Sequence, residues 1–428
     1  MKNGPAVVLK NPLILSLAVF LMLGNAASAG AAEQAVSLQG LVQDALKTSP
    51  AVGAKKAGYE AARSKVIKAW LPEDPMAGVD VENQSELLKP GSRMDKEFMI
   101  SQTIPFPTKL LLSGAAASKE ADMAYQTYRE EERAVIWRIE QPSYQLFLSK
   151  RTIAALEENK TLLDQFANVV KARYESGAAD QADYLKVQIE IAQLSIELFD
   201  WRQREHLAEA GVSRQLNRPL DTRYSIEENP KRTPLALSLA DLEKTALAKR
   251  PELKALDSAV GRAKAGRALA KTEWLPDITA RVEARKFKGD DEFREYDNFI
   301  GISVPVWSLF KGIGGGWRSA DAEVRAAELL YIEGRNEMLH HVHEAYSKFL
   351  SAQNALNTYE SVILPQAKQQ VDVSLSSYEA GKSDVLNLID AQRTLKNTQI
   401  GYYKAMSDYE MALSDLRLAV GDDLVKAQ

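Results

Sequence analysis

The chain contains one fifteen-residue pattern twice, about half its length apart. The first copy, YESGAADQADYLKVQ, runs from Tyr174 to Gln188, and the second, YEAGKSDVLNLIDAQ, runs from Tyr378 to Gln392. Tyr, Glu, Gly, Asp and Gln occupy the same places in both copies, at an offset of 204 residues (378 − 174). A pattern repeated at this distance predicts an internal two-fold repeat, in which two similar halves build the fold.

Further similarities between the halves extend the repeat in both directions. LVQDALKTSP, which ends at Pro50, returns as LEKTALAKRP, which ends at Pro251, and the triplet Trp-Leu-Pro occurs at Trp70 and again at Trp274. Proline lacks an N–H and clashes with the preceding helical turn, so each motif is expected to end a helix. We therefore expect one repeat over 30–220, a linker over 221–240 and a second repeat over 241–428.

Each half also contains two stretches that alternate between apolar and polar residues. DITARVEARKF, from Asp277 to Phe287, alternates most regularly, and FIGISVPVW, from Phe299 to Trp307, does so too. Period-two alternation places apolar side chains on one face of a strand. The pattern predicts β-hairpins at about 77–106 and 277–307, whose strands have the length of tilted transmembrane strands. A water-soluble hairpin with one wet face is the alternative.

The longest segments have the apolar spacing of coiled coils. Apolar residues recur at alternating intervals of four and three from Met338 to Ile363, and a second such series runs from Leu388 to Val420. This period of 3.5 residues indicates helices that wind around neighbours. Long helical hairpins are expected at about 112–217 and 318–420, with a bend or local unwinding at Pro142 and Pro365. The predicted fold class is therefore mainly α with a small β part.

The duplicated pattern fits the bend between the two helices of each hairpin. Gly177 and Gly381 suit the left-handed position that ends a helix, and Asp180 and Asp384 suit the N-cap of the returning helix. Two β-hairpins and two helical hairpins leave a single copy incomplete, because four strands cannot close a barrel with an interior. Copies of the chain are therefore expected to share one barrel and one helical tube.

Composition narrows the function and the compartment. The chain has 428 residues, no cysteine and a formal net charge of −4, which excludes disulfides, thiolate metal sites, an N-terminal lipid anchor on cysteine and a nucleic-acid footprint. Lys2 and Lys10, an apolar run over 12–23 and Ala27-Ser28-Ala29 predict an export signal over residues 1–29. An uncleaved N-terminal anchor is the alternative.

These features together resemble the TolC-like outer-membrane factors, the exit ducts of tripartite efflux and secretion systems. The resemblance rests on the repeated Tyr-Glu-x-Gly bends, the Trp-Leu-Pro strand entries and the strand exits SQTIPFP and GISVPVW. It implies a homotrimer with a twelve-stranded transmembrane β-barrel in the outer membrane and an α-barrel in the periplasm. It also implies a periplasmic adaptor and an inner-membrane pump as partners, with outer-membrane lipid around the barrel. The segments ENQ and QTIPFPTK resemble the heavy-metal-efflux branch of this family.

The resemblance also suggests residues that gate passive conduction of substrate. Asp390, Asn387 and Asp384 are expected at the pore constriction, where a solvated helix surface is the alternative for Asp390. Tyr378 and Asp183 carry over as a polar latch of the closed tip, with Lys382 or Ser383 at the latch's basic position. Packing at a helix end is the alternative for Tyr378.

Other motifs are weaker, and no catalytic, cofactor or metal site is expected. His340 and His343 share a helical face, yet no second cluster completes a metal site. KGIGGGW lacks the ending of a phosphate loop and fits a flexible elbow between strand and helix. Trp70 and Trp274 suit either a membrane-interface belt or ordinary packing. A periplasmic adaptor and a coiled-coil scaffold without a pore remain the alternative functions, and no enzyme activity is expected.

Overall fold

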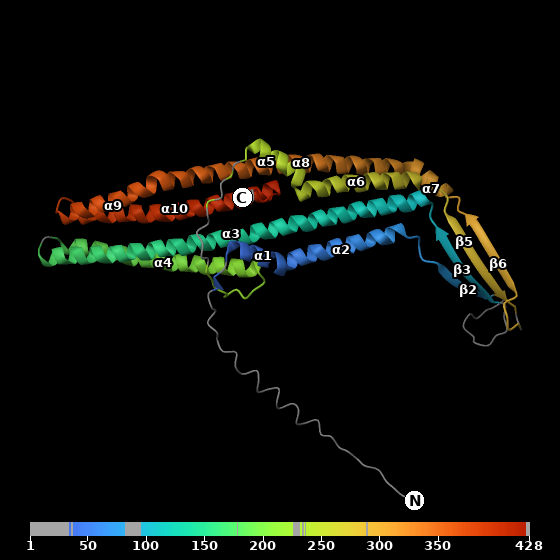
Figure 1. Cartoon of the computed structure of the whole chain (residues 1–428), viewed down its shortest axis with the longest axis horizontal. Helices are drawn as coiled ribbons and strands as arrows, with labels where there is room; N and C mark the ends of the chain where they lie inside the picture. The colour runs from blue at the N-terminus through green and yellow to red at the C-terminus, as the bar shows by residue number, and fades with distance from the viewer. Residues whose placement is uncertain are drawn as a thin grey trace, which may run out of the picture.

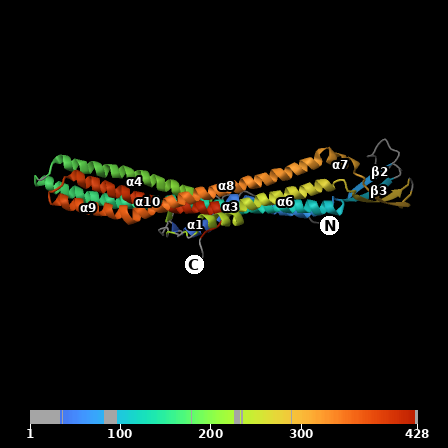
Figure 2. The ribbon, with the colours of Figure 1, turned by 90° about the horizontal axis from the view of Figure 1, so that it is seen from above.

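The computed structural model describes residues 34–35, 37–81, 96–177, 179–225, 232, 235, 237–287 and 290–424. The expected export signal over 1–29 lies outside these residues, as does part of the expected linker over 221–240. Long helices run along the molecule, with a sheet at one end and two helical bends at the other (Figure 1). The view from above shows the same elongated arrangement (Figure 2).

The elements of the first half follow a simple order of two short helices, two strands and two long helices. They are α1 (Leu38–Thr48), α2 (Pro50–Trp70), β2 (Met76–Val81), β3 (Lys96–Ile104), α3 (Pro107–Glu175) and α4 (Gln181–Gln215). Two short strands, β1 (Gln34–Ala35) and β4 (Tyr224–Ser225), pair in parallel beside them.

The second half follows the same order, but its first long helix is divided. Its elements are α5 (Leu239–Lys249), α6 (Pro251–Thr272), β5 (Ile278–Lys286), β6 (Glu295–Ile302), α7 (Val306–Lys311), the π-helical turn η1 (Gly312–Gly316), α8 (Trp317–Thr358), the π-helical turn η2 (Tyr359–Ile363), α9 (Leu364–Glu379) and α10 (Val385–Val420). The mainly helical fold with a small antiparallel sheet agrees with the fold class expected from the sequence.

The two helix-interior prolines are accommodated differently. Pro142 lies within α3, which remains α-helical over 69 residues, or about 100 Å at 1.5 Å per residue. The helix α4 passes close to this proline, because a Cβ placed on Gly211 would lie 3.0 Å from the Pro142 Cβ. Pro365 instead follows η2, whose wider turn suits a residue that cannot donate to the preceding turn. The local unwinding expected at the prolines is therefore seen only at the second.

The four longer strands form one antiparallel sheet in the order β2-β3-β5-β6. Its central pair, β3 and β5, joins the two halves, with Ile104 opposite Ile278 and Ile100 opposite Val282. The register places apolar side chains on one face, and many of them are exposed: Val79, Phe98, Ile100, Ile104, Ile278, Val282, Tyr296, Ile300 and Ile302.

The other face of the sheet carries charged groups that pair with one another. Arg285 pairs across strands, 3.2 Å from Glu97 and 3.7 Å from Glu295, and Arg281 lies 2.5 Å from Glu283 on the same strand. The sheet therefore has one apolar and one polar face, as the alternation predicts.

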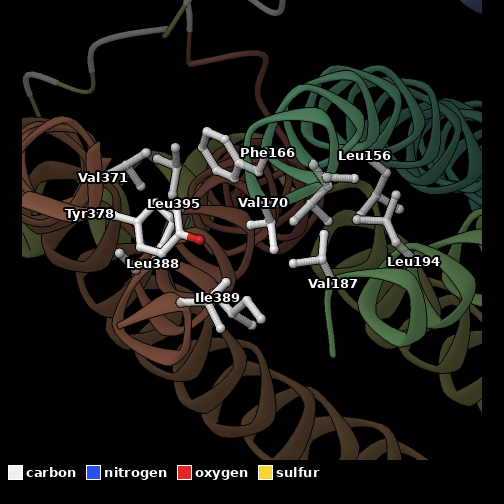
Figure 3. Packing of buried hydrophobic residues seen from close by; sticks show 14 of the residues in the cluster. Leu156, Phe166, Val170, Val187, Leu194, Val371, Tyr378, Leu388, Ile389 and Leu395 are labelled. Atoms are coloured by element: carbon white, nitrogen blue, oxygen red, sulfur yellow. The ribbon is translucent and has the colours of Figure 1, made fainter. Parts of the chain in front are cut away.

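Three buried apolar clusters hold the helices together. The tip cluster joins α3, α4, α9 and α10, and it includes Phe166, Val170, Tyr378, Leu388 and Leu395 (Figure 3). Two clusters in the middle of the molecule pack α5 against α8 and α10, and α1 against α3 and α4. The long helices thus share cores at the tip and at their centre.

Among the residues that the structure describes, none of the helices combines the length and the apolar character needed to cross a bilayer.

Candidate functional site at the helical tip

Glycine forms both bends at the tip. Gly177 has φ 74° and Gly381 has φ 71°, in the left-handed region that favours glycine. The N–H of Gly381 donates to the carbonyl of Tyr378 at 3.0 Å, and the N–H of Lys382 donates to that of Ser377 at 2.9 Å. These two bonds satisfy the carbonyls of Ser377 and Tyr378 at the end of α9.

The two returning helices begin differently, although both follow an aspartate. The Asp384 carboxylate accepts a hydrogen bond from the Asn387 N–H at 3.1 Å and caps α10. Asp180 occupies the N-cap of α4, but in the described structure its side chain forms no capping hydrogen bond. The expectation that both aspartates cap is therefore correct for Asp384 and wrong for Asp180, because only Asp384 has its carboxylate turned toward its own first turn.

The three expected constriction residues lie on the first two turns of α10, and all three are exposed. Asp384 is engaged in the cap, and the Asn387 amide donates to the Ser383 hydroxyl at 3.0 Å. Spacing by three residues places Asp390 on the same side of the helix. The Asp390 carboxylate also contributes, after Glu190, to raising the pKa of Arg393. The group is therefore an acidic, solvent-facing edge of the tip.

The Tyr378 side chain points into the tip cluster rather than toward a polar partner (Figure 3). Its hydroxyl is buried and has no hydrogen-bond partner among the described residues. Asp183 instead accepts from Lys186 at 3.0 Å. The hydrogen bond expected between Tyr378 and Asp183 is thus not formed in this chain, because the ring is held among apolar side chains. Of the other two latch candidates, Lys382 is exposed in the bend, and Ser383 serves the local contact with Asn387.

Arg173, on the first hairpin, makes the closest contacts to Tyr378. Its guanidinium donates to the backbone carbonyl of Tyr378 and lies over the ring, 4.8 Å from the ring centroid. Burial raises the pKa of the Tyr378 phenol, the Arg173 charge opposes this shift, and Asp183 adds to it. Tyr378 therefore joins the two hairpins through its backbone and its ring face.

Two ion pairs connect α4 to α10 further from the bends. The Arg393 guanidinium donates to the Glu190 carboxylate, with its Nε at 2.9 Å, and Lys396 lies 2.7 Å from Glu197. The Glu190 side chain is only 5% exposed, whereas that of Arg393 is 46% exposed. Sequence reasoning missed both pairs. Two acids seven residues apart on α4 and two bases three residues apart on α10 are a weak signal that the helices form ion pairs with each other.

Amide side chains occupy the seam between α3 and α10. Asn159 donates to Gln399 at 2.6 Å and accepts from Gln392 at 2.5 Å. The sequence places both glutamines in gaps of the apolar series, where polar residues fix the register of a coiled coil. Asn159 is buried, so these bonds hold α3 and α10 in one alignment.

The histidines form contacts other than metal ligation. His343 lies 2.5 Å from Glu243 and so ties α8 to α5, and the rings of His340 and His341 have centroids 6.2 Å apart. No group of three or more potential metal ligands occurs in the part of the chain that the structure describes.

Comparisons with known proteins identify related sequences and folds. Residues 242–422 match the outer membrane efflux protein family. The cobalt-zinc-cadmium resistance protein CzcC of Cupriavidus metallidurans is 21% identical over 317 residues, which cover 72% of each chain. The resemblance stated from the sequence is therefore confirmed, and the matched family is one of outer-membrane efflux channels.

Solved structures share the whole fold at low identity. The outer membrane protein VceC of Vibrio cholerae superposes with a TM-score of 0.75 at 17% identity, over 90% of this chain and 96% of that one. CusC, a protein described as forming a transmembrane channel, superposes with a TM-score of 0.76 at 13% identity, over 90% and 92% of the two chains. The fold of this chain is thus that of the solved outer-membrane channels.

Proposed function

We propose that this chain, a relative of the outer membrane efflux proteins, is one subunit of a homotrimeric outer-membrane channel that serves as the exit duct of a tripartite efflux system. The observation that supports this most strongly is the sheet, which has an exposed apolar face and two unpaired edges, β2 and β6. Backbone groups in lipid need partners, so strands span a bilayer only in closed barrels. Three copies of a four-stranded sheet supply a twelve-stranded barrel.

The two faces of the sheet fit this arrangement. Exposed side chains such as Ile100, Val282 and Ile300 would face lipid, and the face with Glu97, Arg285 and Glu295 would line the lumen. Outward apolar and inward polar side chains are the pattern of transmembrane barrels. The alternative functions, a periplasmic adaptor or a coiled-coil scaffold, give no role to an exposed apolar sheet.

The helices also lack partners that neighbouring subunits would supply. Exposed apolar side chains follow α4 at helical spacing: Leu185, Ile189, Ile196 and Phe199. A helix stripe of this kind needs a further helix to cover it. In the trimer, helices of the adjacent subunit would do so and close a periplasmic α-barrel.

The mechanism is passive conduction through a tip that opens and closes. The contacts of Arg173 with Tyr378 and of Arg393 with Glu190 would hold the tip closed, and their loss would let the hairpins separate. Three copies of Asp390, with Asp384 and Asn387 beside it, would form the acidic constriction and favour cations over anions. A periplasmic adaptor and an inner-membrane pump would deliver the cargo, for which the relationship to CzcC favours metal cations.

Planar bilayer recording of the purified protein tests the channel. We expect stepwise ion conductance and a trimer that resists heat in SDS, and Asp390→Asn should lower the cation-to-anion permeability ratio by about twofold. Asp164→Asn, an exposed acid on α3, is the matched control and should leave the ratio unchanged. A monomer that extracts without detergent and conducts no ions would overturn the proposal.

A pair of strand variants tests the orientation of the sheet. Val282→Arg places a charge on the apolar face, where it should destabilise the barrel by about 2–4 kcal/mol at mid-membrane depth. Glu295→Gln, on the opposite face, should leave membrane insertion intact. Equal yields of heat-resistant trimer from both variants would contradict the assignment of the two faces.

A further inference from the structure

In the described structure, the helix that follows β6 contains a π-helical turn near its start, whereas the corresponding part of α3 is α-helical. In the first half, α3 begins three residues after β3 ends, at Pro107. In the second half, the helix α7 likewise begins four residues after β6 ends, at Val306 (Figure 1), and the π-helical turn η1 separates it from α8. Residues 306–316 thus stand at the boundary between the sheet and the long helices.

The helix α7 exposes the apolar side chains that a water-soluble helix would bury. Trp307 is 78% exposed, Phe310 60% and Ile313 57%. At about 100° per residue, these three side chains share one arc with Val306 and Leu309, and Lys311 lies at its edge.

The opposite side of α7 is the one that faces the protein. Gly312 is buried there, and a Cβ added to it would lie 2.7 Å from the Trp317 ring. The Trp317 indole N–H in turn donates to the Ala270 carbonyl at 3.2 Å, which anchors the segment to α6. The side of α7 that carries Gly312 is therefore fixed against the helices, and the apolar arc faces outward.

Two further observations identify what covers this arc. The exposed apolar residues Ile300, Ile302 and Val304 immediately precede α7 in the sequence. The apolar arc of α7 therefore follows the strand that carries the apolar face of the sheet. Lys311 and Arg318 are both exposed, and in the described structure neither has an acidic partner. Apolar bulk with aromatic rings and flanking cations is the composition of a segment that lies in a phospholipid surface.

We propose that α7 and Ile313 form an interfacial anchor that lies in the phospholipid surface at the periplasmic edge of the barrel. This inference rests on the proposed function, since it requires the sheet to be in lipid. Trp307, Phe310 and Ile313 insert among the acyl chains near the headgroups, and Lys311 reaches the phosphates. A single such anchor in each subunit fixes the depth of the barrel on the side where the second half joins its long helix.

Tryptophan quenching by brominated lipid tests the anchor in the full chain. The protein is reconstituted into phosphatidylcholine–phosphatidylglycerol vesicles with bromine placed either near the headgroups or deep in the acyl chains. Fluorescence of Trp307 is taken as the difference between the native protein and Trp307→Phe, and we expect it to be quenched about twofold more by shallow than by deep bromine. Trp201→Phe, on α4, is the control and should remove no lipid-quenched component.

A labelled cysteine provides a second measurement that does not depend on removing the indole. Because the chain has no cysteine, Phe310→Cys creates a unique site for an environment-sensitive fluorophore. We expect a blue-shifted emission in vesicles that is quenched by lipid carrying a nitroxide near the headgroups.

The outcomes separate the anchor from the channel itself. Failure of the protein to float with vesicles would overturn the proposed function and the anchor together. Flotation without quenching of Trp307, or a label that the nitroxide lipid does not quench, would overturn the anchor alone and assign the arc to a neighbouring subunit.

Discussion

The middle and the tip of the molecule join the same two hairpins by different means. In the middle, the buried Glu140 of α3 accepts from Ser414 of α10, and Arg417 lies 3.5 Å away. Nearby, the Trp137 indole donates to Asp415 at 2.6 Å. At the tip, apolar packing is supplemented by two ion pairs, and the Arg393 side chain of one remains 46% exposed, whereas the Lys396 side chain of the other is 10% exposed.

Because of this difference, the two helical hairpins should resist separation more strongly in the middle than at the tip. The Glu140 side chain is 8% exposed and that of Arg417 is 19% exposed, so neither can recover full hydration without unpacking the helices. Arg393, with nearly half of its side chain in water, can leave its partner at a smaller cost. We infer that the middle is a fixed joint and that the tip is the part that opens.

The largest effect is expected from removing the carboxylate in the middle. Glu140→Ala should lower the free energy of unfolding by about 3 kcal/mol, because it leaves the largely buried Arg417 charge without its partner. The thermal midpoint in detergent measures the change. Glu344→Ala breaks an exposed pair with Lys348 within α8 and should leave the thermal midpoint almost unchanged, because water screens that pair. Similar decreases of the thermal midpoint in both variants would mean that burial of the Glu140 pair does not make the middle a stronger joint.

A pH dependence of the middle follows from the same residue. Burial raises the pKa of Glu140, and burial likewise raises the pKa of Glu130. The folded state therefore binds protons more tightly than the unfolded state. The stability contributed by protonated Glu140 is fully present below the pKa that this carboxyl has in the unfolded chain. It is lost as the pH rises through the higher pKa that the carboxyl has in the folded protein. Thermal midpoints at pH 5 and pH 8 should differ less in Glu140→Gln than in the native protein. An unchanged difference would mean that other groups control the titration.

A smaller effect on stability, with a larger effect on gating, is expected at the tip. Arg393→Ala leaves the buried Glu190 carboxylate unpaired, which should weaken the closed tip by about 1.4 kcal/mol and raise the open fraction about tenfold. Single-channel recording measures the open fraction. Lys186→Ala, which breaks a local pair with Asp183 on α4, is the control and should not change it. A drop in the thermal midpoint with no change in gating would place the pair outside the gate.

The smallest effect is expected from the Tyr378 hydroxyl. Tyr378→Phe removes a buried group with no partner in the described structure, so stability should change by less than about 1 kcal/mol, toward greater stability. Tyr378→Ala should cost about 3 kcal/mol, because it removes the ring from the tip cluster. An increased open fraction in Tyr378→Phe combined with Asp183→Ala would instead restore the latch expected from the sequence.

Local chemistry explains which features could be predicted from the sequence. Gly177 and Gly381 are predictable because a left-handed bend favours glycine. The two faces of the sheet are predictable because apolar and polar residues alternate around Val282, so that one face of the strand is apolar. Repetition strengthened each of these signals, because both halves carry them.

Features that depend on distant residues were missed or misplaced. The pair of Glu190 with Arg393 joins residues 203 positions apart, and the spacing of acids and bases on each helix does not specify which of them meet. The sequence identified Tyr378 but not the direction of its hydroxyl, which the apolar residues of three other helices decide. Asp180 matches Asp384 in the repeat, yet only one of the two caps its helix, since side-chain rotamers are not repeated with the sequence.

The pairing of β3 with β5 has a consequence for biogenesis. The central ladder of the sheet joins residues 96–104 to residues 278–286, so strands of the first half keep a bare edge until the second half has emerged. In the proposed channel, a chain interrupted before residue 278 would carry an unsatisfied strand edge and an exposed apolar surface, which would make it a substrate for chaperones and proteases. In the proposed channel, membrane entry would therefore wait for about two thirds of the polypeptide (286 of 428 residues), whatever order the helices follow.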